Sequence, residues 1–489
     1  MNCCGGSGIN LLCHRRPGGA CRLTCRSGLS SALMKTTAPG PAGPDLLRQI
    51  RTILADPLQF LLDSARTYGD IVQFPIGGLA VYAVNTPDAV KHVLLDNHHH
   101  YSKNTLQYRT LALVTGNGLL TSDGEFWLRQ RRRLQPAFHR ARLAGFGTAM
   151  TAAAGRMLER WDALEADAPL DVDAEMMRLA LEIVGQTLFS ADLSREADDL
   201  AQATLTALDF IIYRAQTPLA PPLWLPTARH RRFRAALRTL DQAVHRLVAA
   251  RRADGAGPDD LLGLLLNARG DDGAPMDDRQ LRDEIVTLIV AGHETVASAL
   301  TWTWRLLAEN PAAEARLHEE LGSVLGGRTP TVDDLPRLPY TRAVFDEALR
   351  LYPPAWLITR KALKPDEIAG CAIPAGALII ISPYVVHRQP ALWPDAEVFR
   401  PERFLEKDAD APRFAYLPFG GGPRLCIGNT FALMEGALAL ATVAQRYRLR
   451  LAPGRPVKVD PLVTLRPHGG LRMTWERRST TDGGRTRQR

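Results

Sequence analysis

Two periods of hydrophobic residues divide this chain into helical and extended segments. Between Asp45 and about Phe74, and from Pro87 to about Lys364, apolar residues recur at the three- and four-residue intervals of amphipathic helices. Another helical run follows Cys426. Short apolar or alternating runs predict strands at 71–74, 80–85, 364–384 and 457–475. The pattern predicts a mainly α fold with a minor β region assembled from distant segments.

The 489 residues favour one large domain over several. No Ser/Gly linker separates two periodic blocks, no repeat is present, and the 46% of apolar side chains can fill a large core. The longest apolar runs, such as Ala377 to Ile381, are far shorter than the ~18 to 20 residues of a membrane span. We expect a domain over 45–475, a disordered extension or mis-assigned start at 1–44 and a disordered basic tail at 476–489.

The formal net charge of +8 is concentrated at the two ends of the chain. Residues 1–44 hold five basic side chains and no acidic one, and residues 476–489 hold five arginines against Glu476 and Asp482. The body between them has equal numbers of basic and acidic side chains. A neutral body disfavours nucleic acid as a partner.

Five of the seven cysteines lie within the first 25 residues. A body with only Cys371 and Cys426 is suited to a reducing cytoplasm. The N-terminal cysteines form no C-x-x-C pair, and the segment lacks the apolar core of a secretory signal. We expect an extension or translated leader, with Met34 as the true start; a redox or metal-binding tail is the alternative.

One glycine-rich segment has the composition of a metal-ligand loop. It reads FGGGPRLCIG from Phe419 to Gly428 and stands just before a helical run. A tight loop of this kind directs backbone N–H groups at the Cys426 sulfur and holds it as a thiolate, a strongly donating ligand. Gly428 would allow close approach of a flat cofactor, Phe419 would pack on its ring, and Arg424 would pair with its carboxylate. A structural cysteine, the alternative, needs none of these neighbours.

These residues match the signature F-x-x-G-x-R-x-C-x-G, and from about Pro57 to Gly470 the chain resembles the cytochrome P-450 superfamily. The resemblance implies the P-450 fold around a buried haem b (iron protoporphyrin IX), with Cys426 as the axial ligand of the iron. It also implies O2 as co-substrate. Because the chain has no flavin or nicotinamide segment, electrons from NAD(P)H would arrive through a separate partner, a ferredoxin or similar donor with its reductase.

A second motif, AGHET, interrupts an apolar helical run at 291–295. The Thr295 hydroxyl can bond the Ala291 carbonyl one turn back, and Gly292 leaves room for a diatomic ligand and a water. Glu294 would then supply protons beside Thr295. A polar kink in a buried helix is the alternative. The superfamily resemblance implies catalytic roles for Glu294 and Thr295 and a structural role for His293.

The same resemblance implies roles for two groups of charged or aromatic residues. Glu347 and Arg350 are three apart on one helical face, and with Arg403 they match a buried network that supports the haem loop without a catalytic role. Trp127 and Arg131 are four apart on another helix and can both reach a haem propionate, a role the resemblance extends to Arg360. A solvated basic helix and a surface arginine are the alternatives.

Two other motifs carry no site. The three consecutive histidines at 98–100 do not face one centre, so a solvated turn is expected in place of a metal site. The sequence Gly-Asn-Gly at 116–118 follows no strand, so it does not indicate a nucleotide site.

The expected substrate pocket is almost wholly apolar, which favours a large hydrocarbon. Its residues are Val290, Ala291, Pro354, Ala355, Trp356, Leu357 and Thr464. Segments 106–109, 291–302, 351–356 and 463–467 are similar to bacterial carotenoid β-ring hydroxylases. The similarity implies a monooxygenase that hydroxylates the β-ionone ring of a carotenoid, at C-2 or C-3. A fatty-acid or terpenoid hydroxylase and a non-catalytic haem-thiolate sensor are the alternatives.

The Pro-rich stretch Thr217 to Pro226 joins two helical runs. It carries Leu219, Leu223, Trp224 and Leu225 and is followed by Arg229, Arg231, Arg232 and Arg234. Apolar tips with basic flanks have the composition of an interfacial anchor. We expect a cytoplasmic protein that touches the membrane surface through a mobile lid here; a loop packed on its own protein is the alternative.

Overall fold

The computed structural model describes residues 37–478, apart from 77, 166–167, 218, 254–259, 270–273, 407–411 and 455. The interpretations of the cysteine-rich segment and of most of the basic tail lie outside the described residues. The described elements extend slightly past the predicted domain, since the first helix begins at Gly43 and the last strand ends at Arg477.

The predicted mainly α fold with a minor β region is confirmed. The α-helices are α1 (Gly43–Ala55), α2 (Pro57–Tyr68), α3 (Pro87–Lys91), α4 (Leu106–Thr115), α5 (Gly124–Leu134), α6 (Arg140–Asp162), α7 (Val172–Leu188), α8 (Ala197–Gln216), α9 (Ala228–Ala253), α10 (Leu261–Asn267), α11 (Asp278–Glu309), α12 (Pro311–Leu325), α13 (Pro339–Leu351), α14 (Pro383–Val386) and α15 (Asn429–Arg446). The strands are β1 (Ile71–Ile76), β2 (Leu79–Val84), β3 (Tyr101–Ser102), β4 (Leu170–Asp171), β5 (Ile358–Ala362), β6 (Asp366–Ile368), β7 (Cys371–Ile373), β8 (Leu378–Ile381), β9 (Tyr447–Leu451), β10 (Val459–Pro461), β11 (Leu465–Pro467) and β12 (Arg472–Arg477).

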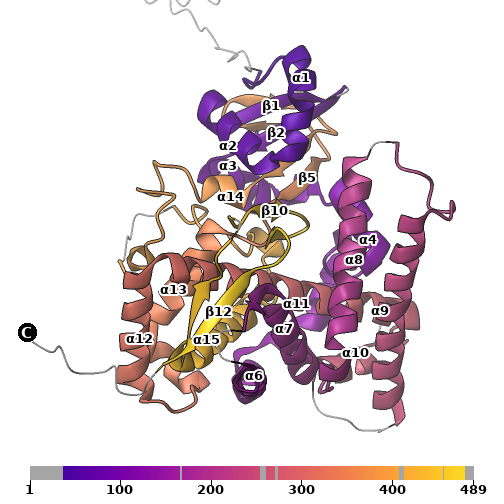
Figure 1. Ribbon diagram of the computed structural model, residues 1–489. Helices are drawn as coiled ribbons and strands as arrows, with labels where there is room; N and C mark the ends of the chain where they lie inside the picture. The colour runs from indigo at the N-terminus through magenta and orange to yellow at the C-terminus, as the bar shows by residue number, and fades with distance from the viewer. Residues whose placement is uncertain are drawn as a thin grey trace, which may run out of the picture.

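Helix α11 is the axis of the helical part. It begins where the Asp277 side chain accepts a 2.7 Å hydrogen bond from the Gln280 N–H, which caps the first turn. An 18-residue window of α11 is apolar enough to cross a membrane, yet 83% of that window is buried inside the protein. Helices α7, α9, α13 and α15 pack around it, with α8 and α9 on one side and α12 and α13 on the other (Figure 1). The apolar surface of α11 is therefore part of the hydrophobic core.

A five-stranded sheet lies at one end of the molecule together with α1 and α2 (Figure 1). Its strand order is β1-β2-β8-β5-β3, with β8 parallel to β2 and antiparallel to β5. The helical region predicted up to about Lys364 ends earlier, at Leu351, and strand β5 follows it and carries Arg360. Pro353 and Pro354 end α13, and the residues after them gain backbone partners in β8.

The remaining strands form small sheets near the helical core. Strands β4, β12 and β9 make one sheet, β6 and β7 make a hairpin, and β10 pairs with β11. In the β10–β11 pair Pro461 lies opposite Leu465, so the turn between them carries Thr464. This hairpin reaches α11, since the Ser298 hydroxyl and the Trp302 indole N–H both donate to the Leu465 carbonyl, at 2.6 and 2.9 Å.

Candidate active site

Cys426 lies in the loop between the 3-10 turn Gly422–Arg424 and α15. Its backbone N–H donates a 3.0 Å hydrogen bond to the carbonyl oxygen of the half-buried Phe419, which closes the loop. Gly422 has a φ of 67°, and a Cβ there would overlap the Leu94 carbonyl oxygen. This glycine is therefore required by the close approach of the loop to its neighbouring segment.

The Cys426 side chain is accessible, although protein surrounds the sulfur closely enough for burial to raise the pKa of the thiol. The backbone N–H of Gly428 and the guanidinium of Arg131 lower the same pKa. Both groups favour the anion, so they act in the direction that a thiolate ligand requires. Gly428 is the loop amide that acts on the sulfur.

Basic side chains from three distant segments gather around Asp123. The Arg424 guanidinium pairs with the Asp123 carboxylate and donates a 2.9 Å hydrogen bond to the Ser122 carbonyl. Burial and the nearby charge of Arg360 hold the pKa of Arg424 at about 10, and burial with both arginines holds that of Lys103 well below its usual range. Lys103 and Arg360 are buried and Arg424 is half-buried, and these three basic side chains beside one carboxylate favour a further anion.

The structure brings most of the predicted cofactor residues together. The Arg424 guanidinium carbon lies 4.0 Å from the centre of the Trp127 ring, in a cation–π contact. Arg360 on β5 donates a 3.4 Å hydrogen bond to the Tyr108 hydroxyl on α4. Arg131, one turn after Trp127 on α5, acts on Cys426 instead. The propionate contacts predicted for Trp127 and Arg131 stay a prediction.

Lys103 is a member of this cluster that the sequence pattern did not reveal. It is 6% exposed, and its ammonium donates to the Leu120 carbonyl and lies 4.2 Å from the centre of the Tyr108 ring. A single lysine outside a periodic segment gives no spacing signal. Only the fold brings it to Arg360 and Arg424.

The AGHET segment lies in the middle of α11. The predicted bond from the Thr295 hydroxyl to the Ala291 carbonyl is confirmed at 2.8 Å. Glu294 is buried and accepts a 2.6 Å hydrogen bond from the Thr464 hydroxyl. Burial raises the pKa of the Glu294 carboxyl, while the Thr464 bond and the Arg466 charge oppose that shift. The geometry therefore holds Glu294 against the β10–β11 hairpin.

The predicted pocket residues divide into accessible and packed side chains. Ala355 is exposed, and Ala291 and Leu357 are half-buried, whereas Val290 and Thr464 are buried. Trp356 is 7% exposed and packs in a cluster with residues of α2 and β1, and its indole N–H donates to the Leu462 carbonyl at 2.9 Å. Successive side chains of an extended segment point to opposite sides, so Ala355 and Leu357, on either side of Trp356, are the more accessible side chains.

The predicted Glu-Arg-Arg network is present and fully enclosed. Arg350 donates two hydrogen bonds to the Glu347 carboxylate, at 2.7 and 2.8 Å, and both side chains have no solvent exposure. Arg403 adds a bond of 3.0 Å to the same carboxylate. Arg350 also donates to the carbonyl oxygens of His387 and Ala396, at 2.8 and 2.7 Å. The network therefore fixes the long irregular segment that leads toward the Cys426 loop.

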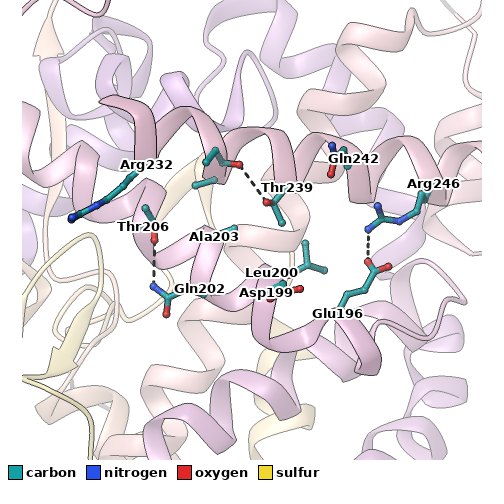
Figure 2. Close-up of a pocket in the computed structure, with 12 residues that line it drawn as sticks. Glu196, Asp199, Leu200, Gln202, Ala203, Thr206, Arg232, Thr239, Gln242 and Arg246 are labelled. Carbon is teal, nitrogen blue, oxygen red and sulfur yellow. Dashed lines mark hydrogen bonds and ion pairs between the residues drawn. The ribbon is translucent and has the colours of Figure 1, made fainter. Parts of the chain in front are cut away.

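A separate groove lies on the outer face of the α8–α9 pair. Figure 2 shows its polar side chains, with Glu196 and Arg246 in an ion pair of 2.6 Å across the two helices. Its lining consists of residues of α8 and α9 together with Glu196, and it includes no residue of the sites described above. The groove is therefore distinct from the Cys426 site.

Residues 46–471 match the protein family Cytochrome P450. The chain belongs to that family. It is 41% identical to cyclooctatin synthase of Streptomyces melanosporofaciens over 91% of this chain and 96% of the relative. It is 36% identical to pentalenene oxygenase of Streptomyces avermitilis, over 89% and 96%. It is also 35% identical to the protein LUTEIN DEFICIENT 5 of Arabidopsis thaliana, over 84% and 73%. The protein is therefore a P450 monooxygenase.

The residues of this P450 fit the haem that its family uses. The cationic excess at Lys103, Arg360 and Arg424 suits the two propionates, which are the anionic part of that cofactor. A Cβ at Gly428 would meet only the Phe138 ring, at 3.7 Å, so protein packing does not explain this glycine and a flat group can approach it. A haem held by a thiolate supplies the activation of O2.

The individual roles of these side chains remain predictions. Cys426 would bind the iron, and Arg131 would stabilise the thiolate. Thr295 and Glu294 would hold and deliver protons, because α11 carries both beside its accessible Ala291.

Proposed function

We propose that this P450 hydroxylates a C–H bond of a large apolar isoprenoid, specifically the β-ionone ring of a carotenoid. One observation carries the proposal: the polar groups beside the AGHET segment bond to one another. The Thr464 hydroxyl is committed to Glu294, and the Thr295 hydroxyl to the Ala291 carbonyl. The accessible neighbours Ala291, Ala355 and Leu357 are apolar. Such a surface favours a hydrocarbon bound by its shape.

The alternative of a fatty acid receives less support. A carboxylate substrate needs a cation to hold it in a dry pocket. Arg131 acts on Cys426, and the basic side chains grouped with Asp123 and Trp127 lie where the propionates of haem are expected. They would be neutralised by the cofactor.

The names of the relatives support an isoprenoid. Cyclooctatin and pentalenene are cyclic terpenoids, and lutein is a carotenoid. A cyclic terpenoid is our second candidate substrate, because the terpenoid enzymes are the more similar relatives, at 41% and 36% identity against 35%. Both candidate substrates would be hydroxylated at a C–H bond, and they differ in the length of the hydrocarbon.

Expression in cells that accumulate β-carotene tests the substrate directly. We expect hydroxylated β-rings in the pigment extract when the wild-type chain is expressed with a ferredoxin and its reductase, and none with Cys426→Ala. Unchanged pigment, together with oxidation of a cyclic terpene by the same reconstituted enzyme, would instead support the second candidate.

We further propose that a ferredoxin delivers electrons from NAD(P)H at the face of α5. Arg129 and Arg132 are exposed on this helix on either side of Arg131, which acts on Cys426. An acidic donor would be attracted to this face, and its reduction rate would fall as salt screens the charges. Charge reversal at Arg129 and Arg132 should therefore raise the donor concentration needed for half-maximal reduction while leaving carotenoid binding unchanged.

A further inference from the structure

A buried polar network lies beneath the AGHET segment and reaches a different helix. The short β11 strand and the turn before it place Thr464 and Arg466 two positions apart. Thr464 bonds Glu294, while Arg466 pairs with the Asp173 carboxylate on α7 and donates a 3.3 Å hydrogen bond to the Met177 sulfur. Arg466 and Asp173 are each 6% exposed. Two carboxyl groups thus share one guanidinium in the interior.

The charges in this network do not balance if both acids are ionised. One arginine can neutralise one carboxylate, and a second buried carboxylate without a partner is strongly disfavoured. Asp173 takes the direct ion pair and a further 3.3 Å bond from the Thr301 hydroxyl. Glu294 has the Thr464 hydroxyl as its hydrogen-bond donor. The proton is therefore assigned to Glu294, and the negative charge to Asp173.

Two further titratable groups face this network. The first is Asp171, at the start of α7: burial and this carboxylate raise the pKa of Asp173, while the Arg466 ion pair and the Thr301 bond lower it. The second group is His293, on α11 itself. It has no solvent exposure, and both of its ring nitrogens lack a hydrogen-bond partner among the described residues. Burial and the Arg466 charge lower the pKa of His293 to about 3, so the ring stays neutral. It therefore does not compensate either carboxylate.

We propose that Arg466 and Asp173 are positioning residues that keep Glu294 in its acid form against Thr464 and thereby ready to give up a proton. This inference rests on the proposed roles of Glu294 and Thr295. The proton of Glu294 would pass to the Thr295 hydroxyl as that hydroxyl gives its own proton to the reduced oxygen co-substrate. A proton from solvent water would then replace the one that Glu294 has given up.

Infrared spectroscopy of the full chain tests this assignment without turnover. The wild-type protein should show, at neutral pH, a carboxylic-acid C=O band that Glu294→Gln removes. Asp173→Asn leaves Arg466 without its carboxylate, so Glu294 should ionise in its place and the band should disappear or titrate at lower pH. Arg466→Met should have the opposite effect and add acid absorption, because neither carboxylate then has a counter-ion.

Asp260→Asn is the matched control. It removes the carboxylate of another buried ion pair, in which Asp260 lies 2.7 Å from Arg251 on α9. We expect no change in the Glu294 band. A wild-type spectrum without a Glu294 acid band, or an Asp173→Asn protein with an unchanged band and titration midpoint, would overturn the proposal. These readings need no substrate, so they stand even if the carotenoid assignment fails.

A double-mutant comparison separates an effect of Asp173 on Glu294 from an effect of Asp173 on the stability of the fold. Asp173→Asn alone should lower the product formed per electron consumed by about tenfold, within the contribution expected of one proton donor. In a Glu294→Gln background the same change should have no further effect, because its target is gone. Additive losses in the two backgrounds would show that Asp173 acts on the fold alone and would refute its role toward Glu294.

Discussion

The Nε2 atom of His387 accepts a 2.9 Å hydrogen bond from the backbone N–H of Leu417. The other ring nitrogen lies 3.1 Å from the Arg350 carbonyl oxygen and donates to it. Burial lowers the pKa of His387 to about 3, which keeps the ring neutral, as one accepting and one donating nitrogen require. This histidine thus links the Glu347–Arg350 network to the segment that enters the Cys426 loop.

His387→Leu should loosen that loop. The substitution leaves the Leu417 N–H buried without an acceptor, at a cost of about 1–3 kcal/mol in the free energy of unfolding. We expect a lower melting temperature by circular dichroism and faster loss of haem during incubation. The control is His468→Ala, because the His468 ring is exposed and pairs with the nearby Asp460. Equal haem retention in wild type and His387→Leu would contradict the proposed link.

Cys426→Ser should abolish the spectrum that a thiolate ligand gives to the reduced carbon monoxide complex. A hydroxyl is not ionised near neutral pH and donates far less charge to a metal than a thiolate. Cys371→Ser is the control, since Cys371 is the other cysteine among the described residues and is buried in β7. The ligand assignment fails if Cys426→Ser retains the thiolate-type spectrum.

Thr295→Ala should retain haem while diverting electrons from product to hydrogen peroxide. The change removes the hydroxyl beside Glu294 without touching the Cys426 loop, so proton delivery is affected and binding is not. Thr303→Ala is a closely matched control, because Thr303 makes the same kind of bond to the carbonyl four residues back, at 2.7 Å, farther along α11. A proton-delivery role is excluded if both variants form as much product per electron as wild type.

Glu284→Gln should change how stability depends on pH. Glu284 has no solvent exposure and accepts a 2.9 Å hydrogen bond from the Leu119 N–H; burial raises the pKa of its carboxyl to about 7, from 4.5. The folded protein therefore holds a proton that the unfolded chain releases above about pH 4.5, and stability falls by about 3 kcal/mol as pH rises to about 7.

The glutamine variant should lose this dependence and gain stability relative to wild type as pH rises. Denaturant unfolding at about pH 5 and about pH 8 measures the difference between the two proteins. Glu309→Gln, at the exposed end of the same helix, should follow the wild-type curve. If the stability of wild type and Glu284→Gln depends on pH in the same way, the raised pKa of Glu284 does not contribute to the pH dependence of stability.

The loop between α8 and α9 is our proposed contact with the membrane surface. Trp224 is 75% exposed and Leu223 39%, as the anchor hypothesis requires. Arg231 and Arg234 donate to the carbonyl oxygens of Pro226 and Leu223, at 3.0 and 2.6 Å, so two of the basic side chains lie against the C-terminal part of the loop. The cytoplasmic location remains part of this proposal.

Changing Leu223 and Trp224 to Ser should weaken binding to anionic vesicles and slow turnover of membrane-embedded carotenoid. Apolar side chains provide the insertion and the basic ones the electrostatic attraction. A small water-soluble substrate should be processed normally. Val398→Ser removes another exposed apolar side chain, 54% exposed, and should leave vesicle binding intact. Unchanged vesicle binding by the double variant would identify the loop as packing on its own protein.

Local features of this protein can be predicted from its sequence. The Cys426 loop and the AGHET segment were identified from consecutive residues, because a tight turn and a bond to the carbonyl four residues back depend only on neighbours in the chain. The Glu347–Arg350 pair was found for the same reason, since its members are one helical turn apart. The mainly helical character of the chain follows from its apolar periodicity in the same way.

The tertiary structure decided every relation between distant segments. Lys103 meets Arg424, Asp173 meets Arg466 and Thr464 meets Glu294 only because the strands and helices that carry them pack together. A single buried polar residue leaves no period in the sequence, so neither its burial nor its partner can be read from spacing. Trp356 shows the same limit, because which side of an extended segment faces the core depends on what packs against it.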